Sequence, residues 1–273
     1  MMTATEKPVL KLIELPGRVK LQYVEQGDRA GTPAIFLHGI TDSWHSFEPV
    51  LPHLPESIHA FALSQRGHGD SDRPADGYSP SDFAADVSAF MSALNIERAV
   101  IAGHSMGSHI AQRFAIDYPE RMLGLVLMGT FFTFRNNAAV AELREAVSKL
   151  SDPIDPAFAL EFQQSTLAGT VPQAFLETVV EESLKVPARV WRAALKGLIE
   201  DEHSERLSEI EAPTLIVWGE QDMFCPRGDQ DTLQAAIAGS ELMVYPGAGH
   251  GLHWDEPERF AADLAAFIES LPE

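Results

Sequence analysis

The stretch Gly103-His104-Ser105-Met106-Gly107 lies between an apolar run, Ala99 to Ala102, and a helix-like stretch, Ser108 to Tyr118. A Gly-x-Ser-x-Gly pattern at a strand-to-helix turn puts its serine at the tip of a sharp, strained elbow. There the hydroxyl is exposed, and the N–H groups of the helix start point at whatever the serine attacks. We expect glycine to be required at both flanks, because a Cβ there would collide with nearby backbone. The context favours Ser105 as a nucleophile over the alternative of a serine that only caps a helix.

The composition is that of a globular protein. The chain has 273 residues, of which 45% are hydrophobic and 22% charged, enough for one large α/β domain or a core with an insertion. Twenty basic against 40 acidic residues give a formal net charge of −20. This charge opposes binding to phosphate backbones and to anionic membranes, so we expect neither nucleic acid nor membrane as a partner.

The cysteine content and the apolar runs of the sequence indicate where in the cell we expect the protein. The single cysteine, Cys225, excludes an intrachain disulfide. The first eight residues lack the basic start and apolar core of a signal peptide. The longest apolar run, Leu123 to Phe132, is interrupted by glycine and is too short to span a bilayer. We therefore expect a soluble, cytoplasmic protein, whose oligomeric state the sequence leaves open.

From Pro33 onward, short apolar runs alternate with helix-length segments. Strands that are apolar on both faces and alternate with helices indicate a parallel sheet covered on both sides. Two further runs, Val9 to Leu15 and Val19 to Glu25, suit an antiparallel ribbon at the edge of the sheet. The other expected strands are Ala34 to Leu37, His59 to Leu63, Ala99 to Ala102, Leu123 to Met128, Thr214 to Trp218 and Glu241 to Tyr245. The expected helices are Ser43–Leu54, Pro80–Leu94, Met106–Tyr118, Arg227–Ala238 and Pro257–Leu271.

One long connection breaks this alternation. About 80 residues of mainly helical pattern separate the strand that ends near Gly129 from the strand that starts near Thr214, and a connection of that length is usually an inserted subdomain. Its expected helices are Ala138–Leu150, Pro156–Gln164, Pro172–Leu184 and Ala188–Leu198. We predict a doubly wound, mostly parallel α/β core made of residues 1–130 and 209–273. Residues 131–208 would form a helical cap over the carboxyl ends of the strands, where ligands bind in open α/β sheets.

A serine nucleophile needs a base, usually histidine, oriented by a carboxylate. After an elbow of this type the acid and then the histidine follow along the chain. Asp222 lies just past the strand Thr214 to Trp218, and His250 lies just past the strand Glu241 to Tyr245. Both residues should therefore emerge at the same sheet edge as Ser105.

Each assignment has a competitor. Glu220 and Asp229 could replace Asp222, but the position of Asp222 just after the strand favours it. His253 could replace His250, but the flanking glycines favour His250 as the mobile base, and we expect His253 to pack with Trp254. We expect Cys225 to be a small buried residue.

With this elbow, acid and histidine, the chain resembles the α/β-hydrolase superfamily. The resemblance is to its cap-bearing branch of esterases, lactonases, non-haem haloperoxidases and carbon–carbon bond hydrolases. Besides the three triad positions, Phe36 to Ile40 (Phe-Leu-His-Gly-Ile) resembles the oxyanion loop of the family. Arg66 to Ser71 resembles the loop after the next strand, and Asp255-Glu256-Pro257 resembles the start of the last helix. Ser64 departs from the pattern, because the family commonly has aspartate there.

The resemblance implies which groups complete the site. The backbone N–H groups of Ile40 and Met106 would form the oxyanion hole. Several aromatic residues near the expected cleft are candidates for an apolar acyl or alkyl pocket, although such residues are more often part of the core. They are Trp44, Phe131, Phe132, Phe134 and Trp191.

These observations predict a serine hydrolase that acts on small carboxylic esters or lactones through an acyl-enzyme. Carbon–carbon bond hydrolysis of diketones and haloperoxidase or perhydrolase chemistry are the enzymatic alternatives. A ligand-binding receptor on the same fold is the non-enzymatic one. We expect no cofactor and no metal, because the histidines considered, such as His38, His45 and His68, show no metal-ligand spacing along the chain.

Overall fold

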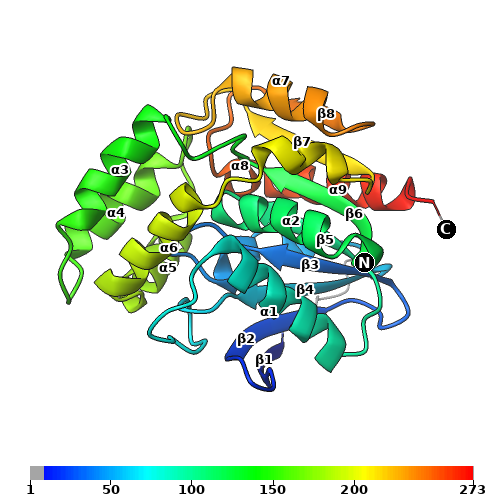
Figure 1. The fold of residues 1–273 in the computed structure, drawn as a ribbon, viewed down its shortest axis with the longest axis horizontal. Coiled ribbons are helices and arrows are strands. Elements are labelled where there is room, and N and C mark those ends of the chain that lie inside the picture. The colour runs from blue at the N-terminus through cyan, green and yellow to red at the C-terminus, as the bar shows by residue number, and fades with distance from the viewer. Residues whose placement is uncertain (1–8, 273) are drawn as a thin grey trace.

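The structure, a computed structural model, describes residues 9–272 and is built on one eight-stranded sheet (Figure 1). The strand order is β1-β2-β4-β3-β5-β6-β7-β8. Strands β3 to β8 run parallel, and β2 is antiparallel to both β1 and β4, which confirms the expected edge ribbon. The strands are β1 (Val9–Glu14), β2 (Lys20–Gln26), β3 (Thr32–Leu37), β4 (Ile58–Ser64), β5 (Ala99–His104), β6 (Met122–Met128), β7 (Thr214–Gly219) and β8 (Glu241–Tyr245).

Helices cover both faces of the sheet, as the two-sided apolar strands require. Within β3, Ile35 and Leu37 face one core, together with Phe90 of α1 and Ile110 of α2. Phe36, one residue along, faces a second core that is closed by α9. The helices outside the long connection are α1 (Pro80–Ala93), α2 (Met106–Asp117), α7 (Arg227–Ala236), α8 (Leu252–Asp255) and α9 (Pro257–Glu269). The predicted α/β fold with a doubly wound, mostly parallel sheet is therefore confirmed.

The segment after β3 differs from its prediction. The expected helix Ser43–Leu54 is instead two short 3₁₀ helices, η1 (Trp44–Phe47) and η2 (Leu51–His53). Pro49 and Pro52 explain the break, because proline has no N–H to donate and its ring clashes with the preceding turn of an α-helix.

Four helices occupy the long connection between β6 and β7. They are α3 (Ala138–Ser148), α4 (Pro156–Ser165), α5 (Gln173–Lys185) and α6 (Ala188–Glu200), followed by the 3₁₀ helix η4 (Ser204–Glu209). Figure 1 shows α3 to α6 grouped together beyond one end of the strands, at the left of the view. The division of the chain into a core and a cap at residues 131 and 208 remains a prediction.

No helix within residues 9–272 is both long enough and apolar enough to cross a membrane.

Candidate active site

Ser105 lies on a strained turn between β5, which ends at His104, and α2, which begins at Met106. Its backbone has φ 53° and ψ −115°, a conformation that non-glycine residues rarely adopt. A Cβ on Gly103 would lie 2.1 Å from the carbonyl oxygen of Gly107. A Cβ on Gly107 would lie 2.1 Å from the carbonyl oxygen of Leu37, at the end of the neighbouring strand. The elbow therefore needs both glycines, the second because β3 passes beside it.

Asp222 and His250 meet at the carboxyl ends of β7 and β8. Nδ1 of His250 donates to Oδ2 of Asp222 at 2.8 Å. The other carboxylate oxygen of Asp222 accepts the N–H groups of Phe224 and Cys225, at 2.8 and 2.9 Å. Because Nδ1 carries the hydrogen of the neutral ring, the lone pair of His250 is on Nε2, where a general base can accept a proton.

A single pocket brings the predicted chemical groups together. Ser105, His250, Ile40 and Met106 all line it, and Asp222 lies behind His250. Met106 is the first residue of α2, so its N–H has no partner within the helix and is available to a developing negative charge. The geometry can therefore support attack by a hydroxyl, with base assistance, beside backbone donors.

The walls of the pocket are mainly apolar. Of the five aromatic candidates, Phe131 and Phe134 line the pocket, whereas Trp44, Phe132 and Trp191 are not among its lining residues. Trp44 belongs to the second core and stacks on His45, and Trp191 packs against Phe158 and Phe162. Sequence reasoning missed the contributions of the helices between β6 and β7, which are Val140 and Leu143 of α3, Phe162 and Gln163 of α4, and Leu195 and Leu198 of α6.

Asp42 is a carboxyl group that lines this pocket, also missed from the sequence. Nε2 of Gln163 donates to its Oδ1 at 2.8 Å. Burial raises the pKa of Asp42 to about 7, against the lowering effect of the Gln163 hydrogen bond. The available signal was its position, two residues after Ile40 of the expected oxyanion loop.

Two buried histidines, His104 and His253, pack beside the elbow and the loop of His250. Nε2 of His104 lies 3.0 Å from the carbonyl oxygen of His250, and Nε2 of His253 lies 3.1 Å from Oγ of Ser46. Burial lowers the pKa of His253 to about 3 and that of His104 well below its usual range, so both rings are neutral. His253 packs near Trp254, with ring centroids 5.4 Å apart, as expected. These histidines hold the His250 loop in place.

Ser64, the departure from the family pattern, has a structural role. Its hydroxyl donates to Oε1 of Gln22 at 2.8 Å and accepts the N–H of Trp44 at 3.3 Å. It therefore fastens the loop after β3 to the end of β4.

Among the described residues, two groups place potential metal-binding atoms within 4.8 Å of one another. One is Asp222, Cys225 and His250 of the site itself; the other is His109, Asp201 and His203. Cys225 is fully buried, as expected, and burial raises the pKa of its thiol well above the usual value. A thiol held in the protonated form is a poor metal ligand, and Asp222 and His250 already bond to each other.

The profile of the α/β hydrolase fold family matches residues 32–257. The chain belongs to this family. It is 28% identical to a non-heme chloroperoxidase of Streptomyces lividans, over 91% of this chain and 95% of that protein. It is also 28% identical to a 2-hydroxy-6-oxononadienedioate/2-hydroxy-6-oxononatrienedioate hydrolase of Paraburkholderia xenovorans, over 97% of this chain and 96% of that protein.

A solved structure extends the likeness. The chain superimposes on an esterase from Exiguobacterium antarcticum with a TM-score of 0.84 and 25% identity, covering 95% of this chain and 99% of that one. The chain is thus a hydrolase of the α/β fold, and its relatives include an esterase, a haloperoxidase and a carbon–carbon bond hydrolase.

Proposed function

We propose that this protein is a serine hydrolase that cleaves uncharged carboxylic esters or lactones. The observation that carries the proposal is the 2.8 Å bond from His250 to Asp222, in a pocket shared with Ser105. A histidine oriented by a carboxylate beside a serine on a strained elbow is the arrangement that activates a hydroxyl for acyl transfer.

The residues of the site have distinct roles in the reaction. Oγ of Ser105 attacks the carbonyl carbon while Nε2 of His250 takes its proton. Asp222 fixes the ring and stabilises the imidazolium that forms. The N–H groups of Ile40 and Met106 stabilise the oxyanion, and each such donor is worth about 3–4 kcal/mol. His250 then protonates the leaving alcohol, and water activated by the same histidine releases the acid.

The charge of the pocket supports a neutral substrate. Among the residues that line it in the described part of the chain there is no lysine or arginine, and there is one carboxyl group, Asp42. A dicarboxylate, which the name of the Paraburkholderia relative implies, would meet no counter-charge there. An uncharged acyl group would meet Phe131, Phe134 and Leu198 instead.

A substrate screen tests the proposal. Wild type and Ser105→Ala would be assayed with acyl esters of increasing chain length, lactones and a vinylogous diketone, and with hydrogen peroxide plus bromide for haloperoxidase chemistry. Ser270→Ala, an exposed serine just after the end of α9, is the matched control. We expect ester or lactone hydrolysis that Ser105→Ala loses and Ser270→Ala keeps, with covalent labelling of the serine by a fluorophosphonate.

Other outcomes would redirect the assignment. Ser105-dependent turnover of the diketone alone would make the protein a carbon–carbon bond hydrolase, and brominating activity alone would make it a haloperoxidase. Ligand binding that survives Ser105→Ala, without turnover or labelling in wild type, would indicate a receptor.

A further inference from the structure

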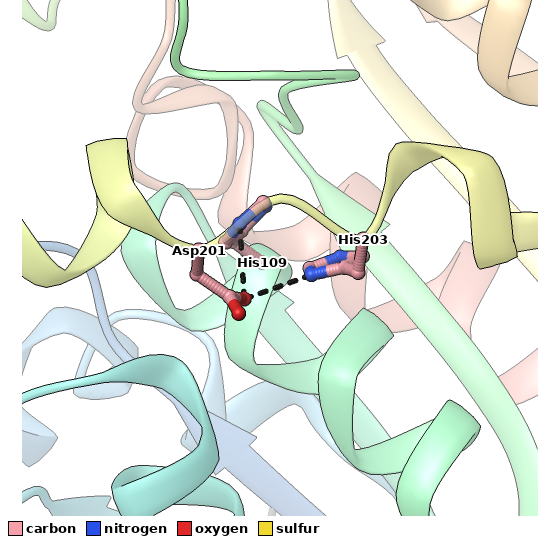
Figure 2. Close-up of side chains that lie close together, drawn as sticks. All are labelled: His109, Asp201 and His203. Atoms are coloured by element: carbon pink, nitrogen blue, oxygen red, sulfur yellow. Dashed lines mark hydrogen bonds and ion pairs between the residues drawn. The ribbon is translucent and has the colours of Figure 1, made fainter.

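Outside the catalytic pocket, His109, Asp201 and His203 converge from two parts of the chain that are distant in sequence. His109 lies in the first turn of α2, four residues after Ser105, and Asp201 and His203 follow the end of α6. Figure 2 shows both imidazole rings directed at the carboxylate of Asp201. Nδ1 of His203 lies 2.9 Å from Oδ2 of Asp201, and Nε2 of His109 lies 3.6 Å from the same oxygen.

Gln112 determines which nitrogen of His203 carries hydrogen. The amide nitrogen of Gln112 donates to Oγ1 of Thr130 at 2.7 Å and to the carbonyl oxygen of Phe131 at 3.2 Å. Its Oε1 must therefore accept from Nε2–H of His203, at 3.0 Å. In the neutral ring this leaves a lone pair on Nδ1, 2.9 Å from a carboxylate oxygen. Two acceptors at that distance repel each other unless a cation lies between them.

The ring of His109 is a second buried group whose polar atoms are not all satisfied. Its side chain is buried, and neither ring nitrogen makes a hydrogen bond of normal length within residues 9–272; the contact of Nε2 with Oδ2 of Asp201, at 3.6 Å, is too long for one. A proton on Nδ1 of His203 would satisfy the contact with Asp201 but would leave His109 unpaired. Buried polar atoms without partners are rare and destabilising, so this ring needs an explanation. A metal ion near Oδ2 would bind Nδ1 of His203, Nε2 of His109 and the carboxylate together, and would leave only Nδ1 of His109 without a partner.

We propose that His109, Asp201 and His203 bind a divalent transition-metal ion, with Zn²⁺ the best match. Zinc–nitrogen and zinc–oxygen bonds of about 2.0–2.2 Å in a tetrahedron put ligand atoms about 3.3 Å apart. The observed separations of 2.9 and 3.6 Å lie on either side of that value. Two imidazoles and one carboxylate suit zinc and exclude magnesium, which prefers oxygen ligands. Water would supply the fourth ligand.

The surrounding groups already hold two of the three ligands, His203 and Asp201, in place. Gln112 anchors the nitrogen of His203 that faces away from the metal, an arrangement typical of metal-binding histidines. Nη1 of Arg113 lies 3.2 Å from Oδ1 of Asp201, so its charge is directed at the oxygen that the metal does not use. Nε of Arg113 also donates to Asp117, at 2.6 Å.

The site would join the inserted helices to the helix of the nucleophile. Asp201 directly follows the last residue of α6, and His109 belongs to α2, the helix that begins just after Ser105. The bound metal would therefore link the end of α6 to α2.

Calorimetry with zinc tests the proposal. Metal-free protein, dialysed against EDTA, would be titrated with ZnCl₂ as wild type, His109→Gln, Asp201→Asn and His203→Gln. We expect one zinc per chain in wild type, at least tenfold weaker binding in each variant, and no binding of MgCl₂. His53→Gln, an exposed histidine, and His250→Gln, from the other candidate cluster, are the matched controls and should bind zinc like wild type.

A thermal measurement covers variants that fold poorly. Asp201→Asn preserves side-chain size and, with circular dichroism confirming the fold, should lose the rise in Tm that zinc gives wild type. The proposal is overturned if wild type binds no zinc in a saturable way. It is equally overturned if binding survives Asp201→Asn or is lost in His250→Gln.

Discussion

Two histidine–aspartate pairs in this molecule have nearly the same distance from Nδ1 to the carboxylate and differ in what surrounds them. Nδ1 of His250 lies 2.8 Å from Asp222, and Nδ1 of His203 lies 2.9 Å from Asp201. The other nitrogen of His250 is left to a pocket that contains Ser105, whereas that of His203 is bonded to Gln112. The pair alone therefore does not make a base. The role of each histidine depends on its second ring nitrogen. A general base needs that nitrogen free, whereas a metal ligand needs it held by a hydrogen bond.

The largest expected difference between the pairs is in turnover. Asp222→Asn keeps the shape of the site but disturbs the proton position on His250, and should lower kcat by about 10⁴-fold. Asp201→Asn makes the same chemical change about the other pair and should lower kcat by less than tenfold. Steady-state kinetics on the best ester from the screen measures both. Equal losses in the two variants would contradict the separation of roles.

The pocket of the first pair holds a further titratable group, Asp42, which gives it a pH dependence. With a pKa of about 7 when folded and 3.8 as a free side chain, Asp42 keeps a proton that the unfolded chain releases. The stability due to this group is therefore complete below about pH 4 and is lost as pH rises to 7. Asp42→Asn should match wild type near pH 4 and be more stable at pH 8 by a few kcal/mol, at about 1.4 kcal/mol per pKa unit.

Urea unfolding across this pH range measures the difference between wild type and Asp42→Asn. A constant difference at all pH values would show that the pKa of Asp42 does not change on unfolding and would contradict the predicted pH dependence.

A substitution of Gln112 tests whether its hydrogen bond holds His203 in place. Gln112→Leu is similar in size but leaves Nε2–H of His203 without an acceptor, so it should destabilise the metal-free protein by about 1–3 kcal/mol. It should also weaken zinc binding by about tenfold or more. Urea unfolding and calorimetry measure the two effects. Gln234→Leu, an exposed glutamine on α7, is the matched control, and equal behaviour of the two variants would argue against the anchor.

The smallest expected effect concerns the residue between the two sites. Phe134 lines the pocket that contains Ser105, and its ring lies edge-on to His109 with centroids 5.0 Å apart. Phe134→Leu should change the ratio of kcat/KM between long and short acyl esters by about tenfold, the lower end of the effect of one methylene in an apolar pocket. Phe158→Leu, which packs on Trp191 outside the pocket, should change it less. An unchanged ratio in Phe134→Leu would remove this residue from acyl recognition.

The two pairs also mark what could be predicted from the sequence. Asp222 and His250 each follow an apolar strand, and the ends of parallel strands share one edge of a sheet, so their order along the chain indicated their meeting. No such rule joins His109 to His203, because the path of α3 to α6 is fixed by side-chain packing rather than by a repeating strand pattern. The same reason hid Val140, Phe162 and Gln163 in the pocket wall. Between Ser43 and Leu54, two prolines overrode an apolar pattern that resembled one helix.

The positive φ of Ser105 has a consequence for how this chain balances stability against activity. A side chain in that conformation costs about 1–3 kcal/mol, which glycine would not incur. Ser105→Gly should therefore relieve the strain and stabilise the folded state. The larger conformational entropy of glycine in the unfolded chain offsets part of this stabilisation. Selection for thermal resistance alone would favour glycine at this position. The serine is retained in a backbone that resists it, and the protein is less stable than its own sheet and helices would allow.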